Sequence, residues 1–96
     1  MTETWEQRLV AETHRMRVWA LAAVKKGAVH WDPARGLGGG FVPKKAGRFD
    51  AGALVALCQL RIDGALVVPT EGGVVGLTVL GVRFHIDPHL RPEGAQ

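Results

Sequence analysis

Residues 49–86 read FDAGALVALCQLRIDGALVVPTEGGVVGLTVLGVRFHI, and this stretch decides the fold. Its first third predicts a helix over Ala51–Ile62, because Asp50 is a favourable N-cap and Gly64 can adopt the left-handed conformation that ends a helix. The spacing of the apolar side chains predicts one buried face formed by Leu54, Leu57, Cys58 and Ile62, with Val55 at its edge. Gln59 and Arg61 are left on the outer side of the predicted helix.

Two β-branched runs follow this helix, one over Ala65–Pro69 and one over Val74–Val79. Thr70-Glu71-Gly72-Gly73 lies between them and contains two glycines, so the pattern predicts a β-hairpin with a four-residue turn. Pro69 has no amide hydrogen to donate to a sheet, which suits it to the end of an edge strand.

Residues 79–87 allow two interpretations. Val82, Phe84 and Ile86 alternate with polar residues, which is typical of a third strand. Alternatively, Thr78 caps a short helix in which Leu80 and Phe84 are four residues apart. The alternation matches more positions, and on the residue pattern we favour the strand.

The order of the elements resembles the second half of a winged helix-turn-helix domain. In that family a core helix is followed by a two-stranded wing that ends in an L-T-x-x-G step, here Leu77-Thr78-Val79-Leu80-Gly81. The resemblance implies an α+β, winged-helix-like fold for one domain over residues 1–96 and favours a helix after Thr78. It also implies double-stranded DNA as the partner, with the helix before the wing facing the major groove and Gln59 as its possible base contact.

The N-terminal part of the chain predicts a long helix over Thr4–Lys26. Thr4 and Gln7 have the spacing of a capping box, and Gly27 can end the helix. One side of this helix carries large apolar residues, namely Trp5, Leu9, Met16 and Trp19. We expect this stripe to form the interface of a homodimer, because tryptophan is enriched at binding hot spots. Residues 18–24 are apolar all round, so we expect them to be buried on every side.

The middle of the chain predicts a short strand over Ala28–Trp31, then a flexible loop. Residues 33–48 hold five glycines and two prolines, which oppose a stable helix. We expect the loop tip at Gly38-Gly39-Gly40 and an ordered return through Phe41 and Val42. Residues 91–96 are expected to be a frayed tail.

Positive charge gathers in this middle part. The net charge is +3, but the segment from Lys25 to Arg61 alone carries +5. Such a segment can contact phosphate groups. The candidate DNA contacts are Lys44, Lys45, Arg48, Gln59, Arg61 and Arg83. We therefore expect a small DNA-binding or transcription-regulating module. The alternative is a protein-interaction module, an adaptor or inhibitor, that uses the apolar helices without nucleic acid.

Catalytic and metal chemistry find little support in the sequence. Cys58 lies among leucines and is expected to be a small core residue rather than a nucleophile. His85, Asp87 and His89 alternate in the manner of metal ligands, but Pro88 interrupts them and no second cluster exists. We expect no enzyme activity, no cofactor and no metal.

A single cysteine suits a reducing compartment. The acidic start of the chain is unlike a signal peptide, and no apolar run is long enough to span a membrane. We expect a cytoplasmic protein that does not bind membranes.

Overall fold

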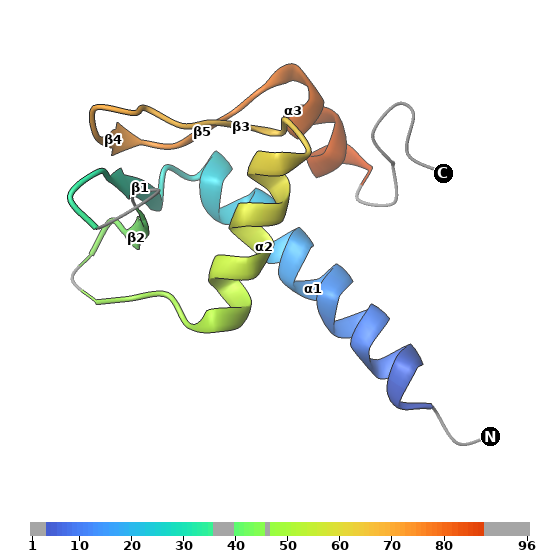
Figure 1. The fold of residues 1–96 in the computed structure, drawn as a ribbon. Helices are drawn as coiled ribbons and strands as arrows, with labels where there is room; N and C mark the ends of the chain where they lie inside the picture. Colours follow the sequence, from blue (N-terminus) through green and yellow to red (C-terminus); the bar gives the residue numbers. More distant parts are fainter. Residues whose placement is uncertain (1–3, 36–39, 46, 88–96) are drawn as a thin grey trace.

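The computed structural model describes residues 4–35, 40–45 and 47–87, and within them the chain has an α+β fold (Figure 1). The elements in chain order are α1 (Trp5–Lys25), β1 (Val29–Asp32), β2 (Gly40–Pro43), α2 (Ala51–Ile62), β3 (Leu66–Val67), β4 (Gly73–Val74), β5 (Gly76–Leu77) and α3 (Val79–Ile86). The predicted loop tip and the predicted tail lie outside the described residues, apart from Gly40.

Both long helices begin at the caps that the sequence predicts. At the start of α1 the Gln7 amide donates to the Thr4 hydroxyl at 3.1 Å, and the Thr4 amide donates to the Gln7 side chain at 2.9 Å, which completes the capping box. At the start of α2 the Ala53 amide donates to the Asp50 carboxylate at 2.8 Å. Gly27 follows α1 with a φ of +74°. The predicted bounds of α2 are confirmed, and those of α1 are confirmed to within one residue.

The strands form two small antiparallel sheets. One has the order β2-β1-β4, and the other pairs β3 with β5. The predicted ordered return through Phe41 and Val42 is confirmed, because Gly40–Pro43 forms β2 and pairs with β1 along its whole length. Gly40, predicted as part of the loop tip, already belongs to this strand. The predicted hairpin is confirmed in part. Its strands pair as Leu66 with Leu77, but Gly73 and Val74 pair with β1 instead. The chain thus crosses from one sheet to the other at Val75.

The core lies where α1, α2, the sheets and α3 meet. Its buried residues are Ala20, Leu21, Val24, Val29, Trp31, Phe41, Leu57, Leu60, Ala65, Leu66, Val75 and Phe84. The indole ring of Trp31 packs edge-on against the ring of Phe41, with 5.0 Å between the ring centroids. Such aromatic pairs add to the stability that their buried area already supplies.

The buried face of α2 differs from the predicted one. It is formed by Ala53, Leu57 and Leu60, so only Leu57 of the expected residues is fully buried. Cys58 is exposed, and Ile62 is 78% exposed, so the expectation that both belong to the core is wrong. The reason is that apolar residues occur on all sides of α2, so their spacing does not define which side faces α1.

The strand interpretation of residues 79–87 is also wrong, because α3 forms there. The Thr78 hydroxyl accepts a hydrogen bond from the Gly81 amide at 3.1 Å and donates one to the Gly64 carbonyl at 2.7 Å. The Thr78 amide donates to the Ala65 carbonyl at 3.0 Å. Gly81 is buried against the same carbonyl, and a Cβ there would overlap its oxygen. Thr78 thus caps α3 while its own hydroxyl and amide are bonded to Gly64 and Ala65. These contacts favour the helix over the strand that the alternation of apolar residues predicts.

One side chain of α1, Arg17, contacts both α3 and the C-terminal end of α2. The Arg17 guanidinium lies 4.4 Å from the centroid of the fully buried Phe84 ring. The same guanidinium forms an ion pair with Asp63 at 3.1 Å, and both side chains are largely buried. Arg17 therefore joins the end of α2 to α3 through one cation.

The first half of α1 extends beyond the rest of the molecule (Figure 1). Trp5 is 71% exposed, and Leu9 and Val10 are exposed as well. The apolar segment 18–24 is only partly enclosed, because Ala20, Leu21 and Val24 are buried while Val18 and Trp19 remain exposed. The expectation that this segment is buried on every side is therefore wrong for Val18 and Trp19, and Ala22 and Ala23 are only half-buried.

We predict that Gly81→Ala lowers the free energy of unfolding by about 2 kcal/mol or more, because the added methyl group must displace the Ala65 carbonyl. Urea denaturation measures this change. Gly76→Ala is the matched control, because a Cβ at Gly76 would meet only an ordinary contact of 4.0 Å with Val67. An equal loss of stability in both variants would contradict the role given to Gly81.

Candidate nucleic-acid interface

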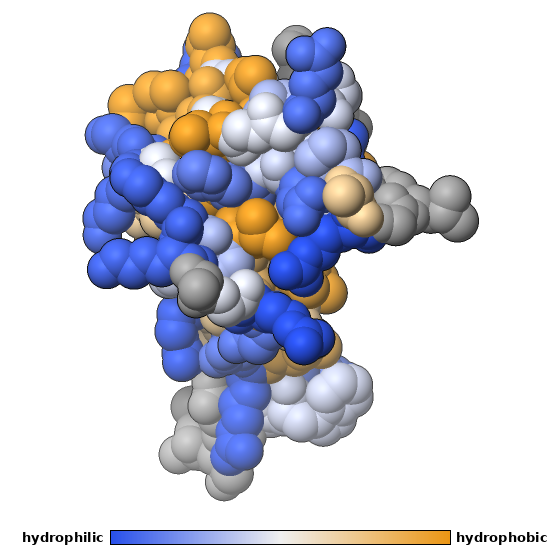
Figure 2. Space-filling view, turned by 90° about the vertical axis from the view of Figure 1, so that its left-hand side faces the viewer, coloured by the Kyte–Doolittle hydropathy of each residue, from blue (hydrophilic) through white to orange (hydrophobic). Residues whose placement is uncertain are grey.

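A groove rimmed by three lysines lies between the end of α1 and the segment that follows β2. We call it the lysine groove, and its cavity volume is about 360 Å³. It is lined by Trp19, Ala22, Ala23, Lys26, Ala28, Pro43, Lys44, Lys45 and Phe49. Figure 2 views the molecule from the side on which β1 and β2 lie and shows strongly hydrophilic side chains spread over this face, with apolar side chains above and between them.

Backbone pairing brings the two walls of the lysine groove together. Val29 pairs with Pro43 in the sheet, and one step further the Lys44 amide donates to the Ala28 carbonyl at 2.9 Å. Ala28 directly follows the glycine that ends α1. Because of this pairing, Lys44 and Lys45 lie beside the last turns of α1, where Lys26 is the C-cap.

The floor of the groove is aromatic and apolar. The rings of Trp19 and Phe49 meet edge to face, with 5.6 Å between their centroids and 79° between their planes. Trp19 remains 38% exposed, so part of its indole surface is open to a ligand. The alanines at positions 22 and 23 leave this surface uncovered.

The charges around the groove have one sign. Among its described lining residues there are three lysines and no carboxylate. Lys26, Lys44, Lys45 and the nearby Arg48 are exposed, and none of them forms an ion pair with another described residue. Such a site attracts an anion and offers its apolar part a surface to pack on.

The structure separates the predicted DNA contacts into different places. Lys44 and Lys45 line the lysine groove, and Arg48 is adjacent to its lining residue Phe49. Lys26 was missed, because its position beside β2 depends on a sheet pairing that the sequence does not reveal. Arg83 lies on α3, on the opposite side of the molecule from β2 (Figure 1).

Two predicted contacts on α2 already have partners inside the molecule. The Arg61 guanidinium lies 4.6 Å from the centroid of the Trp31 ring. The Gln59 side-chain amide donates to the Asp63 carboxylate at 3.1 Å. The rest of the outer side of α2 is apolar, because Val55 is 68% exposed and Cys58 is exposed.

The predicted dimer residues also fall in two groups. Trp5 and Leu9 are exposed on the projecting half of α1. Met16 lies near the first turn of α2, where a Cβ at Gly52 would be 3.9 Å from the Met16 methyl group. Trp19 packs on Phe49 in the lysine groove. Among these four residues, only Trp5 and Leu9 project away from the body of the molecule, where another chain could pack against them alone.

Residues 4–35, 40–45 and 47–87 contain neither a cluster of metal ligands nor a membrane-spanning helix. No group of three or more histidine, cysteine or acidic side chains there is placed to hold a metal ion. His89, which completes the histidine and aspartate pattern of the sequence, lies outside these residues. None of the helices among them is both long enough and apolar enough to cross a membrane.

Comparison with known proteins found no match to the chain among protein-family models, curated proteins or solved structures.

We predict that Arg61→Ala lowers the free energy of unfolding by about 1 kcal/mol, because it removes the cation and its aliphatic stem from the Trp31 ring. Arg83→Ala, on an exposed part of α3, should change stability by less than about 0.5 kcal/mol. Thermal unfolding of both variants measures the difference. Equal effects would show that the stacking of Arg61 contributes nothing.

Proposed function

We propose that the protein is a winged-helix-like module that binds double-stranded DNA through its phosphate backbone and acts as a homodimer. The observation that carries this proposal is the lysine groove, in which Lys26, Lys44 and Lys45 surround an apolar floor without a carboxylate. The α2 helix, the β3–β5 pair and the Thr78 cap follow one another as the core helix and wing of that family do, which supports the family assignment.

The groove suits a phosphate backbone better than a single small anion. Its lysines come from two segments, the C-cap of α1 and the residues after β2, and they are exposed, so they can reach successive phosphates along a strand. Arg48, which precedes the lining residue Phe49 in the sequence, is a further exposed cation of this segment. The exposed surface of Trp19 can pack against a deoxyribose of that backbone.

We expect this binding to be weakly specific. Base recognition depends on side chains such as arginine, asparagine and glutamine placed in the major groove. On α2 the Gln59 amide is held by Asp63, and Arg61 is stacked on Trp31. Phosphate contacts supply affinity and orientation but carry little information about sequence.

The homodimer rests on the projecting half of α1. A helix of a few turns is marginal in water without a partner, and this one exposes Trp5, Leu9 and Val10. A second copy of the chain would bury these side chains. Met16 and Trp19, the other two residues of the predicted seam, lie on the body of the molecule beside α2 and Phe49, so the proposed interface is limited to the projecting half of α1.

A protein-interaction module without nucleic acid is the second candidate function. The outer side of α2 favours it, because Val55, Cys58 and Ile62 form an exposed apolar stripe at helical spacing. A helix in that position would be more polar if it faced bases. The DNA titration below separates the two candidates.

We predict that labelled duplex DNA binds the protein at low salt and that the affinity falls steeply as salt is added. Lys44→Glu and Lys45→Glu should each weaken binding at least tenfold. In Lys44→Ala/Lys45→Ala, the slope of log affinity against log salt should shrink by about 0.9 for each phosphate group that a lysine no longer neutralises. Filter binding at several salt concentrations measures both quantities.

Arg83→Glu is the matched control for charge, because it makes the same change on α3, away from the lysine groove. It should weaken binding less than threefold. Equal losses for Lys44→Glu and Arg83→Glu would mean that net charge alone attracts DNA. No binding at low salt would overturn the DNA proposal and leave the protein-interaction candidate.

We predict that Trp5→Ser/Leu9→Ser converts the dimer to a monomer, because it removes the two largest apolar side chains of the projecting half of α1. Sedimentation equilibrium measures the change. Val55→Ser/Ile62→Ser on α2 is the control and should leave the dimer intact. A wild-type protein that is monomeric at high concentration would contradict the dimer.

A further inference from the structure

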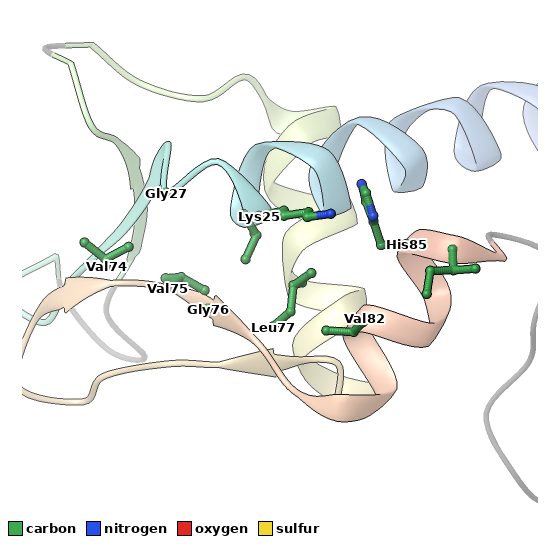
Figure 3. Close-up of a pocket in the computed structure, with 10 residues that line it drawn as sticks. Lys25, Gly27, Val74, Val75, Gly76, Leu77, Val82 and His85 are labelled. Atoms are coloured by element: carbon green, nitrogen blue, oxygen red, sulfur yellow. The ribbon is translucent and has the colours of Figure 1, made fainter.

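A second groove opens on the molecule between the end of α1, the crossing segment 74–77 and α3 (Figure 3). We call it the valine groove, and its cavity volume is about 370 Å³, within the range of small-molecule sites. It shares no lining residue with the lysine groove. Val24, Val75 and Leu77 form its floor, and Val82 and Ile86 line the side that belongs to α3.

The floor of the valine groove is held in place by the core. Val24 and Val75 are buried, and the Val75 amide donates to the Val29 carbonyl at 2.9 Å. The walls, in contrast, are open, because Val82 is 47% exposed and Ile86 is exposed. A rigid apolar floor with uncovered apolar walls gains free energy when an apolar ligand displaces water from it.

The rim of the valine groove carries positive charge. Lys25 stands in the last turn of α1 and His85 in the last turn of α3, and their side chains point toward one another across the opening (Figure 3). None of the described residues that line the groove is acidic. Lysine donates hydrogen bonds as an ammonium group, and histidine donates one through a ring N–H in either protonation state.

We propose that the valine groove binds a small amphipathic carboxylate, such as a medium-chain fatty acid. The hydrocarbon chain lies along the floor formed by Val24, Val75 and Leu77. The carboxylate lies between the Lys25 ammonium group and the His85 ring, which both donate hydrogen bonds to it. The charge of the rim and the apolar floor together select this class, because an alcohol lacks the charge and an amphipathic cation is repelled.

This ligand site does not depend on the proposed function. Its cation is Lys25, whereas the lysine groove uses the next residue, Lys26. The two lysines therefore form a matched pair, in which the same substitution one residue apart changes one groove and spares the other.

The experiment is a titration with octanoate, octan-1-ol and octyltrimethylammonium, followed through the methyl NMR signals of the full chain. Octanoate should shift the signals of Val82 and Ile86 but not those of the remote Val10 and Val55, and it should bind at least tenfold more tightly than either of the other two probes. Lys25→Met should weaken octanoate binding about tenfold, the effect of one charge-assisted hydrogen bond, and Lys25→Arg should preserve it.

Two controls make the result decisive. Lys26→Met should leave octanoate binding unchanged, and Lys25→Met should leave the affinity for octan-1-ol unchanged. The proposal is overturned if octan-1-ol binds as tightly as octanoate, if Lys26→Met causes the same loss as Lys25→Met, or if the shifts at Val10 and Val55 equal those at Val82 and Ile86. An unchanged methyl spectrum in all three titrations would also overturn it.

Discussion

The close contact between Gly81 of α3 and the Ala65 carbonyl is the interaction on which the rest of the structure depends. Only glycine at position 81 lets the helix approach so closely, and the Thr78 hydroxyl holds that approach by bonding to both Gly64 and Gly81. This contact places Phe84 in the core, where the Arg17 guanidinium lies over its ring. It also sets α3 beside the crossing segment 74–77, and the valine groove exists because those two elements meet there.

Local features of the fold could be predicted from the sequence, whereas features set by distant contacts could not. In the Thr4 and Asp50 caps a side chain bonds to the backbone amide three residues further on, so each cap can be identified from nearby residues alone. Whether residues 79–87 form a strand or a helix depends on Thr78, which bonds to the Gly64 carbonyl fourteen residues earlier. The alternation of apolar residues therefore led to the wrong prediction of a strand. Similarly, Cys58 was wrongly predicted to be buried. Apolar residues occur on all sides of α2, so the side that is buried is determined by contact with α1 and not by the sequence of α2.

The candidate site shows the same division. Clustering of charge in the sequence was enough to single out Lys44 and Lys45, which do share a groove. It could not find Lys26, which reaches that groove only because β1 pairs with β2. Nor could it distinguish Arg61, which stacks on Trp31, from cations that remain unpartnered among the described residues. Equal charges in a sequence therefore acquire different roles through the pairing of strands and the stacking of rings.

The three tryptophans occupy three unlike environments. Trp31 is 7% exposed in the core, Trp19 borders the lysine groove, and Trp5 stands on the projecting half of α1. The chain contains no tyrosine, so nearly all of its ultraviolet emission comes from these indoles. Three variants, each with one tryptophan and with phenylalanine at the other two positions, would fluoresce from one place each. Trp31 would report on unfolding of the core, Trp19 on ligand binding in the lysine groove and Trp5 on self-association, without any attached dye.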